Sequence, residues 1–270
     1  MALKALSPRV MGIVNVTPDS FSDGGRLGSV QAAVEHGLRL VAEGAAILDI
    51  GGESTRPGAA PVPVDEEIAR TTPVIAGLRA RWDGPISIDT MKPEVARAAV
   101  AAGATIWNDV SGLGFTDDAV EVAAELGCEV VVMHGLRPGS AQHVEVSTLD
   151  IVPVVLDDLH ARADRAMAAG VARERITLDP GIGFGKTPEQ GFRLTAELPR
   201  LKALGFPVLY GASRKRLIAA ADPTAVQATD RLGGSIALAL AAAVRGADVI
   251  RVHDVRETVQ ALRVLGRLDR

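Results

Sequence analysis

The segment Ala247-Asp248-Val249-Ile250-Arg251-Val252-His253-Asp254, near the C-terminus, determines the architecture expected for this chain. Its apolar run predicts a strand over 248–251, and apolar residues at helical spacing predict a helix over 255–268. Arg251 and His253 are two residues apart, so both side chains point to the same side of a strand. A strand end that presents an Arg and a His is a candidate anion site; a solvated strand end with a surface ion pair is the alternative.

The alternation of a short β-rich run and a longer amphipathic run recurs along the chain. Strands are predicted at 10–14, 46–50, 86–89, 105–108, 129–133, 176–179, 208–211 and 248–251. Helices are predicted at 30–43, 66–79, 93–101, 117–125, 152–169, 188–204, 231–244 and 255–268. Thr187-Pro188-Glu189-Gln190 offers a capping box at one helix start, and Gly205 ends that helix. Eight such units in about 250 residues predict an α/β fold of one domain, a (β/α)8 TIM barrel over 1–270. The alternative, an open doubly wound sheet, usually has fewer strands and a Gly-rich first turn.

Composition narrows the class of protein. A hydrophobic content of 47% is enough to bury a large core, and a net charge of −4 argues against nucleic acid or a membrane surface as a partner. The single cysteine, Cys128, cannot form an intramolecular disulfide and is expected to be a small buried residue. The first ten residues carry no sustained apolar run, and no stretch of about 20 apolar residues follows. We therefore expect a soluble, cytoplasmic protein with no membrane partner.

The barrel geometry predicts where an anion would bind. Active sites of such barrels lie at the C-terminal ends of the strands, and phosphate commonly binds at the loops after strands 7 and 8. Ser213-Arg214-Lys215-Arg216 follows the seventh predicted strand, so several cations are expected near Arg251 and His253. Closure of the barrel also brings Asn15 beside them. An Asn carboxamide oxygen suits Mg²⁺, although an Asn that caps its own loop is the alternative.

Polar residues end three other predicted strands. Asp89, Asn108 and Asp179 each follow an apolar run, and three unpaired polar groups inside a barrel would be costly. Their convergence predicts a polar ligand pocket. Asp179 is the best candidate to accept two parallel donors from a heterocycle with an amino group beside a ring N–H, because the turn at Pro180-Gly181 can fix its direction. His134 either faces this pocket or is a structural histidine.

Two Gly-containing loops border the predicted pocket. The loop 180–187 does not match the phosphate-loop pattern, because Pro180 stands where that pattern needs Gly, so we interpret it as a wall that brings Phe184 and Lys186 to the mouth. The loop 51–58 presents hydroxyls and one Arg, and is either a cover for the mouth or an ordinary exposed loop.

Seven stretches resemble the dihydropteroate synthase family: 11–25, 49–58, 87–90, 108–112, 178–186, 211–215 and 251–254. They extend from the first strand to the last. The resemblance implies an enzyme that joins 6-hydroxymethyl-7,8-dihydropterin diphosphate to 4-aminobenzoate, releasing pyrophosphate and 7,8-dihydropteroate, by SN1-like loss of the diphosphate. It also implies a homodimer and Mg²⁺ as cofactor.

The same resemblance implies roles for individual residues, which fall into four groups. By residue-for-residue match, Asp89, Asn108, Asp179 and Lys215 would hold the pterin. Arg251, His253 and Asn15 would hold the diphosphate, with Mg²⁺ on Asn15. Thr55, Arg56, Pro57, Phe21, Phe184 and Ser213 would shape the aminobenzoate side. Asp23 and Arg56 would help to close the site, and Asn15, Asp23, Arg56, Lys215, Arg251 and His253 would be the catalytic set.

The match has departures, and two alternative functions stay open. The segment 134–142 differs from the family pattern His-Met-Gln-Gly-x-Pro, and Arg216 stands where many members have Ser. A corrinoid methyltransferase would share a pterin-binding barrel but would not need the Arg251 and His253 cluster. A paralogue that binds pterin without turnover would not need both long loops.

Overall fold

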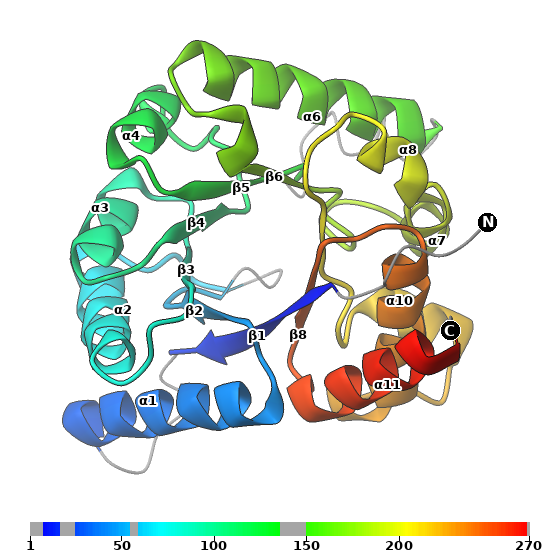
Figure 1. The fold of residues 1–270 in the computed structure, drawn as a ribbon, viewed down its shortest axis with the longest axis horizontal. Coiled ribbons are helices and arrows are strands. Elements are labelled where there is room, and N and C mark those ends of the chain that lie inside the picture. The colour runs from blue at the N-terminus through cyan, green and yellow to red at the C-terminus, as the bar shows by residue number, and fades with distance from the viewer. Residues whose placement is uncertain (1–7, 17–24, 55–58, 136–149, 269–270) are drawn as a thin grey trace.

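The computed structural model describes residues 8–16, 25–54, 59–135 and 150–268, with the backbone alone for 25–29. Within these ranges one sheet holds eight parallel strands in the order β6-β5-β4-β3-β2-β1-β8-β7. A bridge between Leu178 and Val208 joins β6 to β7, so the sheet closes on itself. Figure 1 shows the strands as a central ring with the helices outside it. The predicted single-domain (β/α)8 barrel is confirmed.

The strands agree with the predicted ones to within one or two residues. Their bounds are β1 Arg9–Asn15, β2 Ile47–Gly51, β3 Ile86–Asp89, β4 Ile106–Asp109, β5 Glu129–Met133, β6 Ile176–Asp179, β7 Leu209–Tyr210 and β8 Val249–Val252.

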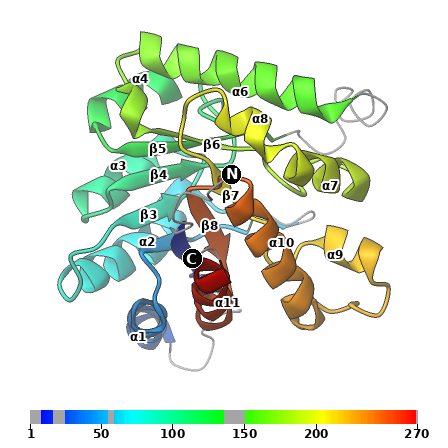
Figure 2. The same cartoon turned by 45° about the vertical axis from the view of Figure 1, so that its right-hand side comes forward.

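The helices form the outer layer. Their bounds are α1 Gly25–Glu43, α2 Val64–Arg79, α3 Pro93–Ala101, α4 Ala119–Leu126, α6 Ile151–Ala168, α7 Pro188–Ala196, α8 Leu198–Lys202, α9 Arg216–Ala221, α10 Leu232–Val244 and α11 Val255–Leu268, with 3-10 turns η2 Arg173–Arg175 and η3 Ala228–Arg231. In both views α10 and α11 lie side by side, next to β8 and β1 (Figures 1 and 2). No described helix is long and apolar enough to cross a membrane.

Two helix predictions were wrong. The helix predicted over 188–204 is broken at Glu197, and Pro199 in the first turn of α8 gives the reason, since a proline has no N–H to donate to the carbonyl of Thr195 four residues earlier. The short helix α9 was missed, because six residues give too little apolar periodicity. The capping box of Thr187 and Gln190 is confirmed.

The barrel interior has an apolar floor and a polar layer above it. The floor is a separate cluster of buried side chains, comprising Met11, Ile47, Ile106, Val131, Leu209 and Val249. Because alternate residues of a strand face the interior, the next inward positions lie two residues further along each strand. On β2, β4 and β8 these positions are Asp49, Asn108 and Arg251. On these three strands the inward positions therefore change from apolar to polar, and their polar side chains form the base of the candidate site.

Candidate active site

Arg251 joins three strands at the polar layer. Its Nε donates to Asp49 Oδ2 at 2.6 Å, and its Nη2 donates to Asp89 Oδ2 at 2.6 Å. The Asp49 side chain is fully buried, and Asp49 also accepts a hydrogen bond from Asn108 Nδ2 at 3.2 Å. Burial would lower the pKa of Arg251, but the two carboxylates outweigh it and raise the pKa. Arg251 is therefore a fixed cation at the mouth, and its Nη1 group is used by neither carboxylate.

Asp89 and Asn108 lie opposite each other on neighbouring strands, as a pocket requires. They are register partners of β3 and β4. Burial raises the pKa of Asp89 to about 7, against the attraction of Arg251. Asp89 Oδ1 is buried and has no hydrogen-bond partner within the described part of the chain. Such an acceptor lacks a donor, which a ligand would supply.

Asp179, at the end of β6, is held as the sequence predicts. Gly181 N donates to Asp179 Oδ1 at 2.7 Å, and the positive φ of Gly181, 64°, makes this turn. Burial raises the pKa of Asp179, although Lys215 opposes the rise. Burial likewise lowers the pKa of Lys215 to about 8, against the attraction of Asp179. Asp179 and the half-buried Lys215 therefore attract each other, and no hydrogen bond joins the two side chains in the described part of the chain.

The loop after β6 is a wall of the site, with one correction. Lys215 Nζ lies 4.5 Å from the centre of the Phe184 ring and donates to Ile182 O, so the loop packs against Lys215; the role of Phe184 in the pocket stays a prediction. Lys186 does not extend to the mouth. Its Nζ donates to the carbonyl oxygens of His134, Gly181 and Phe184 at 2.9 to 3.1 Å, which makes it a brace of the loop.

His134 is buried and carries no charge near neutrality. Burial lowers its pKa to about 4, and its Nδ1 has no partner among the described residues. Its backbone N–H donates to Asp179 O at 3.0 Å, so the end of β5 stays paired with β6 up to the site.

Ser213 and His253 connect the loops after β7 and β8. Ser213 Oγ lies 3.0 Å from His253 Nδ1, and His253 N donates to the same oxygen at 3.2 Å. The next residue of each loop forms an ion pair, because Arg214 binds Asp254 through Nε at 3.0 Å and through Nη2. Arg214 adopts a positive φ of 60°, and its N–H donates to Ser235 Oγ. Of the cations predicted near an anion over 213–216, Arg214 is therefore paired with Asp254 and Arg216 is exposed in α9; whether they meet an anion stays a prediction.

Asn15 ends β1 at the mouth. A Cβ on Gly51 would lie 3.7 Å from Asn15 Oδ1 and 3.8 Å from Asp89 Oδ2, so both oxygens gather around that glycine. A side chain at the end of β2 would therefore make ordinary van der Waals contact with both oxygens, which face one space. Five predicted site residues lie outside the described residues: Phe21, Asp23, Thr55, Arg56 and Pro57.

Asp49 is the one central residue of this layer that sequence reasoning left without a role. A charged residue in the middle of Ile47-Leu48-Asp49-Ile50-Gly51 was a signal, since an unpaired buried carboxylate is costly. Only its partner on β8, 202 positions away, explains why it is there.

The arrangement defines a class of protein: a barrel whose mouth holds a buried carboxylate beside a lysine on one side and a fixed arginine on the other. The model of the pterin binding enzyme family matches residues 11–253, and the chain belongs to that family.

The relatives within the family narrow the class further. The dihydropteroate synthase of Escherichia coli K12 is 44% identical over 96% of this chain and 90% of its own, and that of Synechocystis sp. PCC 6803 is 45% identical over 96% and 89%. A structure of Xanthomonas albilineans dihydropteroate synthase with 4-aminobenzoic acid is 52% identical, with a TM-score of 0.90 over 97% of this chain and 93% of that one. The same enzyme in complex with 7,8-dihydropteroate gives 48% and 0.86, over 98% and 95%. Within its family the chain falls among the dihydropteroate synthases.

Proposed function

We propose that the chain condenses 6-hydroxymethyl-7,8-dihydropterin diphosphate with 4-aminobenzoate and releases 7,8-dihydropteroate and pyrophosphate. One observation carries the proposal. Asp89 Oδ1 is a buried carboxylate oxygen without a hydrogen-bond donor among the described residues. The other oxygen of the same carboxylate binds Arg251, which is a fixed cation. A substrate that carries ring N–H donors and a diphosphate meets both requirements at once. The structures of the Xanthomonas albilineans relative with 4-aminobenzoic acid and with 7,8-dihydropteroate support one substrate and the product of this reaction.

The pterin ring is held by the carboxylates and the amide of the polar layer. Asp179 accepts from the amino group and the adjacent ring N–H, because its Oδ1 is already directed by Gly181. Asp89 and Asn108 bind the other ring edge, and Lys215 lies over the ring system beside Phe184. Neutral pterin donors suit buried acceptors, since each bond replaces the water that burial removed.

The diphosphate is held where β8 ends. Arg251 offers the Nη1 group that Asp49 and Asp89 leave unused, and His253 is oriented by Ser213. The described residues contain no group of three His, Cys, Asp or Glu that could hold a metal ion by themselves. Asn15 fits a different kind of site, because Mg²⁺ is commonly bound by one or two protein oxygens together with substrate phosphates and water. Bound to Asn15 and the diphosphate, Mg²⁺ would offset charge on the leaving group.

The reaction breaks the bond between the pterin methylene carbon and the diphosphate oxygen, and the electron pair leaves with pyrophosphate. Arg251 and His253 stabilise that charge as it develops. Electron release from the pterin ring stabilises the cationic methylene, so departure precedes attack. The amine nitrogen of 4-aminobenzoate then forms the C–N bond and loses one proton. An aromatic amine is neutral near pH 7, so the step needs no strong base.

The aminobenzoate side is formed by Phe184 and Ser213 together with loop residues Phe21, Thr55, Arg56 and Pro57. Asp23 and Arg56 close the site and exclude water, which would otherwise capture the cation.

We also propose that the protein is cytoplasmic and forms a homodimer; light scattering checks the dimer. Leu232 and Val244 on α10 are large apolar side chains exposed to solvent, which an interface would cover.

Release of pyrophosphate in a coupled assay tests the proposal. We expect pyrophosphate release that requires both substrates; no release with both substrates present would reject the function.

Isothermal titration assigns the subsites. Asp179→Ala is expected to lose affinity for a pterin without the diphosphate, whereas Arg251→Ala is expected to lose affinity for pyrophosphate. Unchanged pterin affinity in Asp179→Ala would refute its assignment.

A further inference from the structure

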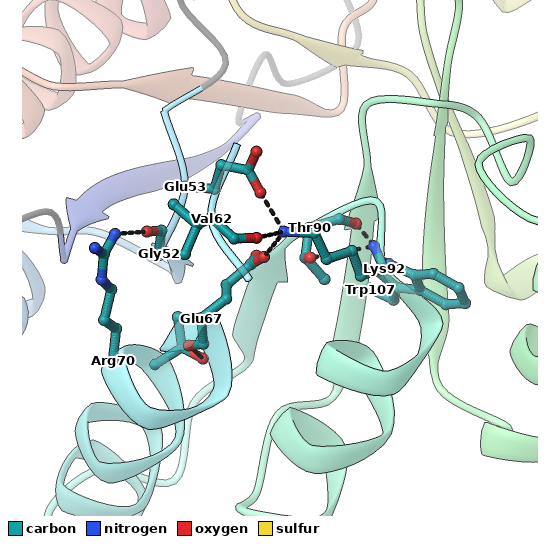
Figure 3. A network of polar contacts seen from close by, with 9 residues as sticks. Gly52, Glu53, Val62, Glu67, Arg70, Thr90, Lys92 and Trp107 are labelled. Atoms are coloured by element: carbon teal, nitrogen blue, oxygen red, sulfur yellow. Dashed lines mark hydrogen bonds and ion pairs between the residues drawn. The ribbon is translucent and has the colours of Figure 1, made fainter. Parts of the chain in front are cut away.

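Lys92 is a buried lysine outside the site, and it binds three groups from separate segments. Its side chain is 8% exposed and its Nζ donates to Glu67 Oε2 at 2.6 Å, to Val62 O at 2.7 Å and to the Glu53 carboxylate. Figure 3 shows these contacts converging on the one nitrogen. An ammonium has three protons to donate, so this lysine is saturated by protein acceptors.

Two of the three acceptors lie at the ends of one loop. Glu53 follows β2 by two residues, and Val62 precedes α2 by two residues. The loop between them contains Thr55, Arg56 and Pro57, which carry the proposed aminobenzoate roles. The third acceptor, Glu67, is fully buried on α2. Lys92 therefore joins both ends of the loop to the first turn of α2.

A second cation, Arg70, holds the first residues of the same loop. Arg70 Nη1 donates to Gly52 O at 2.8 Å, one residue before Glu53 (Figure 3). Arg70 also pairs with Glu66 at the surface. The start of the loop is thus fixed through its backbone by Arg70 and through its side chain by Lys92.

The lysine is itself connected to the site through a short segment. Lys92 N donates to Thr90 Oγ1 at 3.2 Å, and Thr90 N donates to Asn108 O at 3.1 Å. Trp107 Nε1 donates to Thr90 O at 2.8 Å (Figure 3). Thr90 follows Asp89, so the base of the loop and the pterin pocket share one rigid frame.

The charges explain why the contact persists in a buried place. Burial would lower the pKa of Lys92, but its hydrogen bonds to Glu53 and Glu67 outweigh it and raise the pKa. A charge-assisted hydrogen bond in such a place is stronger than one between neutral groups. Of the three acceptors of Lys92, Glu53 is the only one that lies in the loop and accepts through its side chain, and that side chain is 12% exposed.

We propose that Lys92 is a positioning residue for the second substrate: by clamping Glu53 and Val62 it fixes the base of the loop and so sets the affinity for the aromatic amine, without touching it. The identity of that amine rests on the proposed function. The anchoring of the loop does not, because it follows from the contacts alone.

Glu53→Gln is the informative variant, because it weakens the bond to the loop and leaves the buried pair of Lys92 and Glu67 intact. Glu125→Gln is the matched control. It removes the same charge from an exposed ion pair with Arg97, between α3 and α4. The probes are 4-aminobenzoate in steady-state kinetics, a pterin without the diphosphate in titration, and amide hydrogen exchange of the segment 52–62.

We expect Glu53→Gln to accelerate exchange in 52–62 by about tenfold or more, the loss of one charge-assisted hydrogen bond. The KM for 4-aminobenzoate should rise about fivefold to tenfold on the same basis, with pterin affinity and kcat nearly unchanged. Glu125→Gln should change none of these quantities. Lys92→Met in the Glu53→Gln background should raise the KM further, because it also removes the contacts of Lys92 with Val62 O and Glu67.

Unchanged exchange in Glu53→Gln would overturn the clamp. Faster exchange with an unchanged KM for the amine, or an equal loss of pterin affinity, would overturn its role in positioning the second substrate. If the unsubstituted chain forms no product, the proposed function fails, and the exchange experiment still decides whether Lys92 holds the loop.

Discussion

Asp49→Asn tests whether the polar layer depends on a carboxylate that never faces solvent. The substitution keeps the shape of the side chain and removes its charge. Asp49 accepts from Arg251 Nε at 2.6 Å and from Asn108 Nδ2 at 3.2 Å, and its side chain is fully buried. Both donors bond Oδ2, and an asparagine oxygen in that place could still accept from both, but it is neutral, so Arg251 loses the partner that carries a charge.

The expected loss of stability depends on the ion pairs that Arg251 keeps after the substitution. Removing one partner of a buried ion pair costs about 3–5 kcal/mol when the other charge is left alone. Arg251 keeps Asp89 and is 21% exposed, so the smaller value for a hydrogen bond to a charged group, about 1.5–3 kcal/mol, applies. We expect the free energy of unfolding to fall by about 2 kcal/mol. The ratio kcat/KM should fall by about tenfold to a hundredfold, since about 1.4 kcal/mol corresponds to tenfold.

Urea unfolding and steady-state kinetics measure the two quantities. Asp158→Asn is the control, because Asp158 pairs with Arg162 at the same distance of 2.6 Å but is 34% exposed. The control should lose less than about 1 kcal/mol, as is usual for surface ion pairs. Equal losses in the two variants would refute the reasoning that burial makes Asp49 decisive.

Three further predictions concern the walls of the site. Burial lowers the pKa of Lys215 to about 8 from the ordinary lysine value of 10.5, so pterin affinity should fall as pH rises through about 8, and titration with Lys215→Met should give a flat profile. Because the unfolded lysine keeps its proton above pH 8, the same shift makes conformational stability rise with pH between about 8 and 10.5; urea unfolding that showed a fall assignable to Lys215 would contradict this. Gly181→Ala should destabilise the protein by at least about 2 kcal/mol in urea unfolding, since its Cβ would lie 2.0 Å from His134 O and its φ is positive; a loss below about 0.5 kcal/mol would show that the turn relaxes. Arg214→Ala should weaken pyrophosphate binding in titration, because the ion pair with Asp254 holds both anion loops; unchanged affinity would assign that pair to stability alone.

Local sequence signals predicted most of the fold. The apolar runs predicted all eight strands, because a strand buried in a barrel must be apolar along most of its length. Helix boundaries were less accurate. The apolar spacing of the first helix begins at Val30, whereas α1 begins at Gly25, because Gly25, Gly28 and Ser29 carry no apolar side chain that would extend the pattern. The break before Pro199 was a local signal that the long periodicity of 188–204 obscured.

The sequence by itself determined the barrel, the polar ends of its strands and the direction of Asp179, since each depends on neighbours within a few residues. Only the tertiary structure decided how the charges are paired. In the closed barrel Arg251 pairs with Asp49 and Asp89, Arg214 pairs with Asp254, and Lys186 donates to three loop carbonyls. The physical reason is that a buried charge takes whichever opposite charge or carbonyl the closed barrel brings within about 3 Å. That choice depends on residues up to 202 positions apart, which no local pattern records.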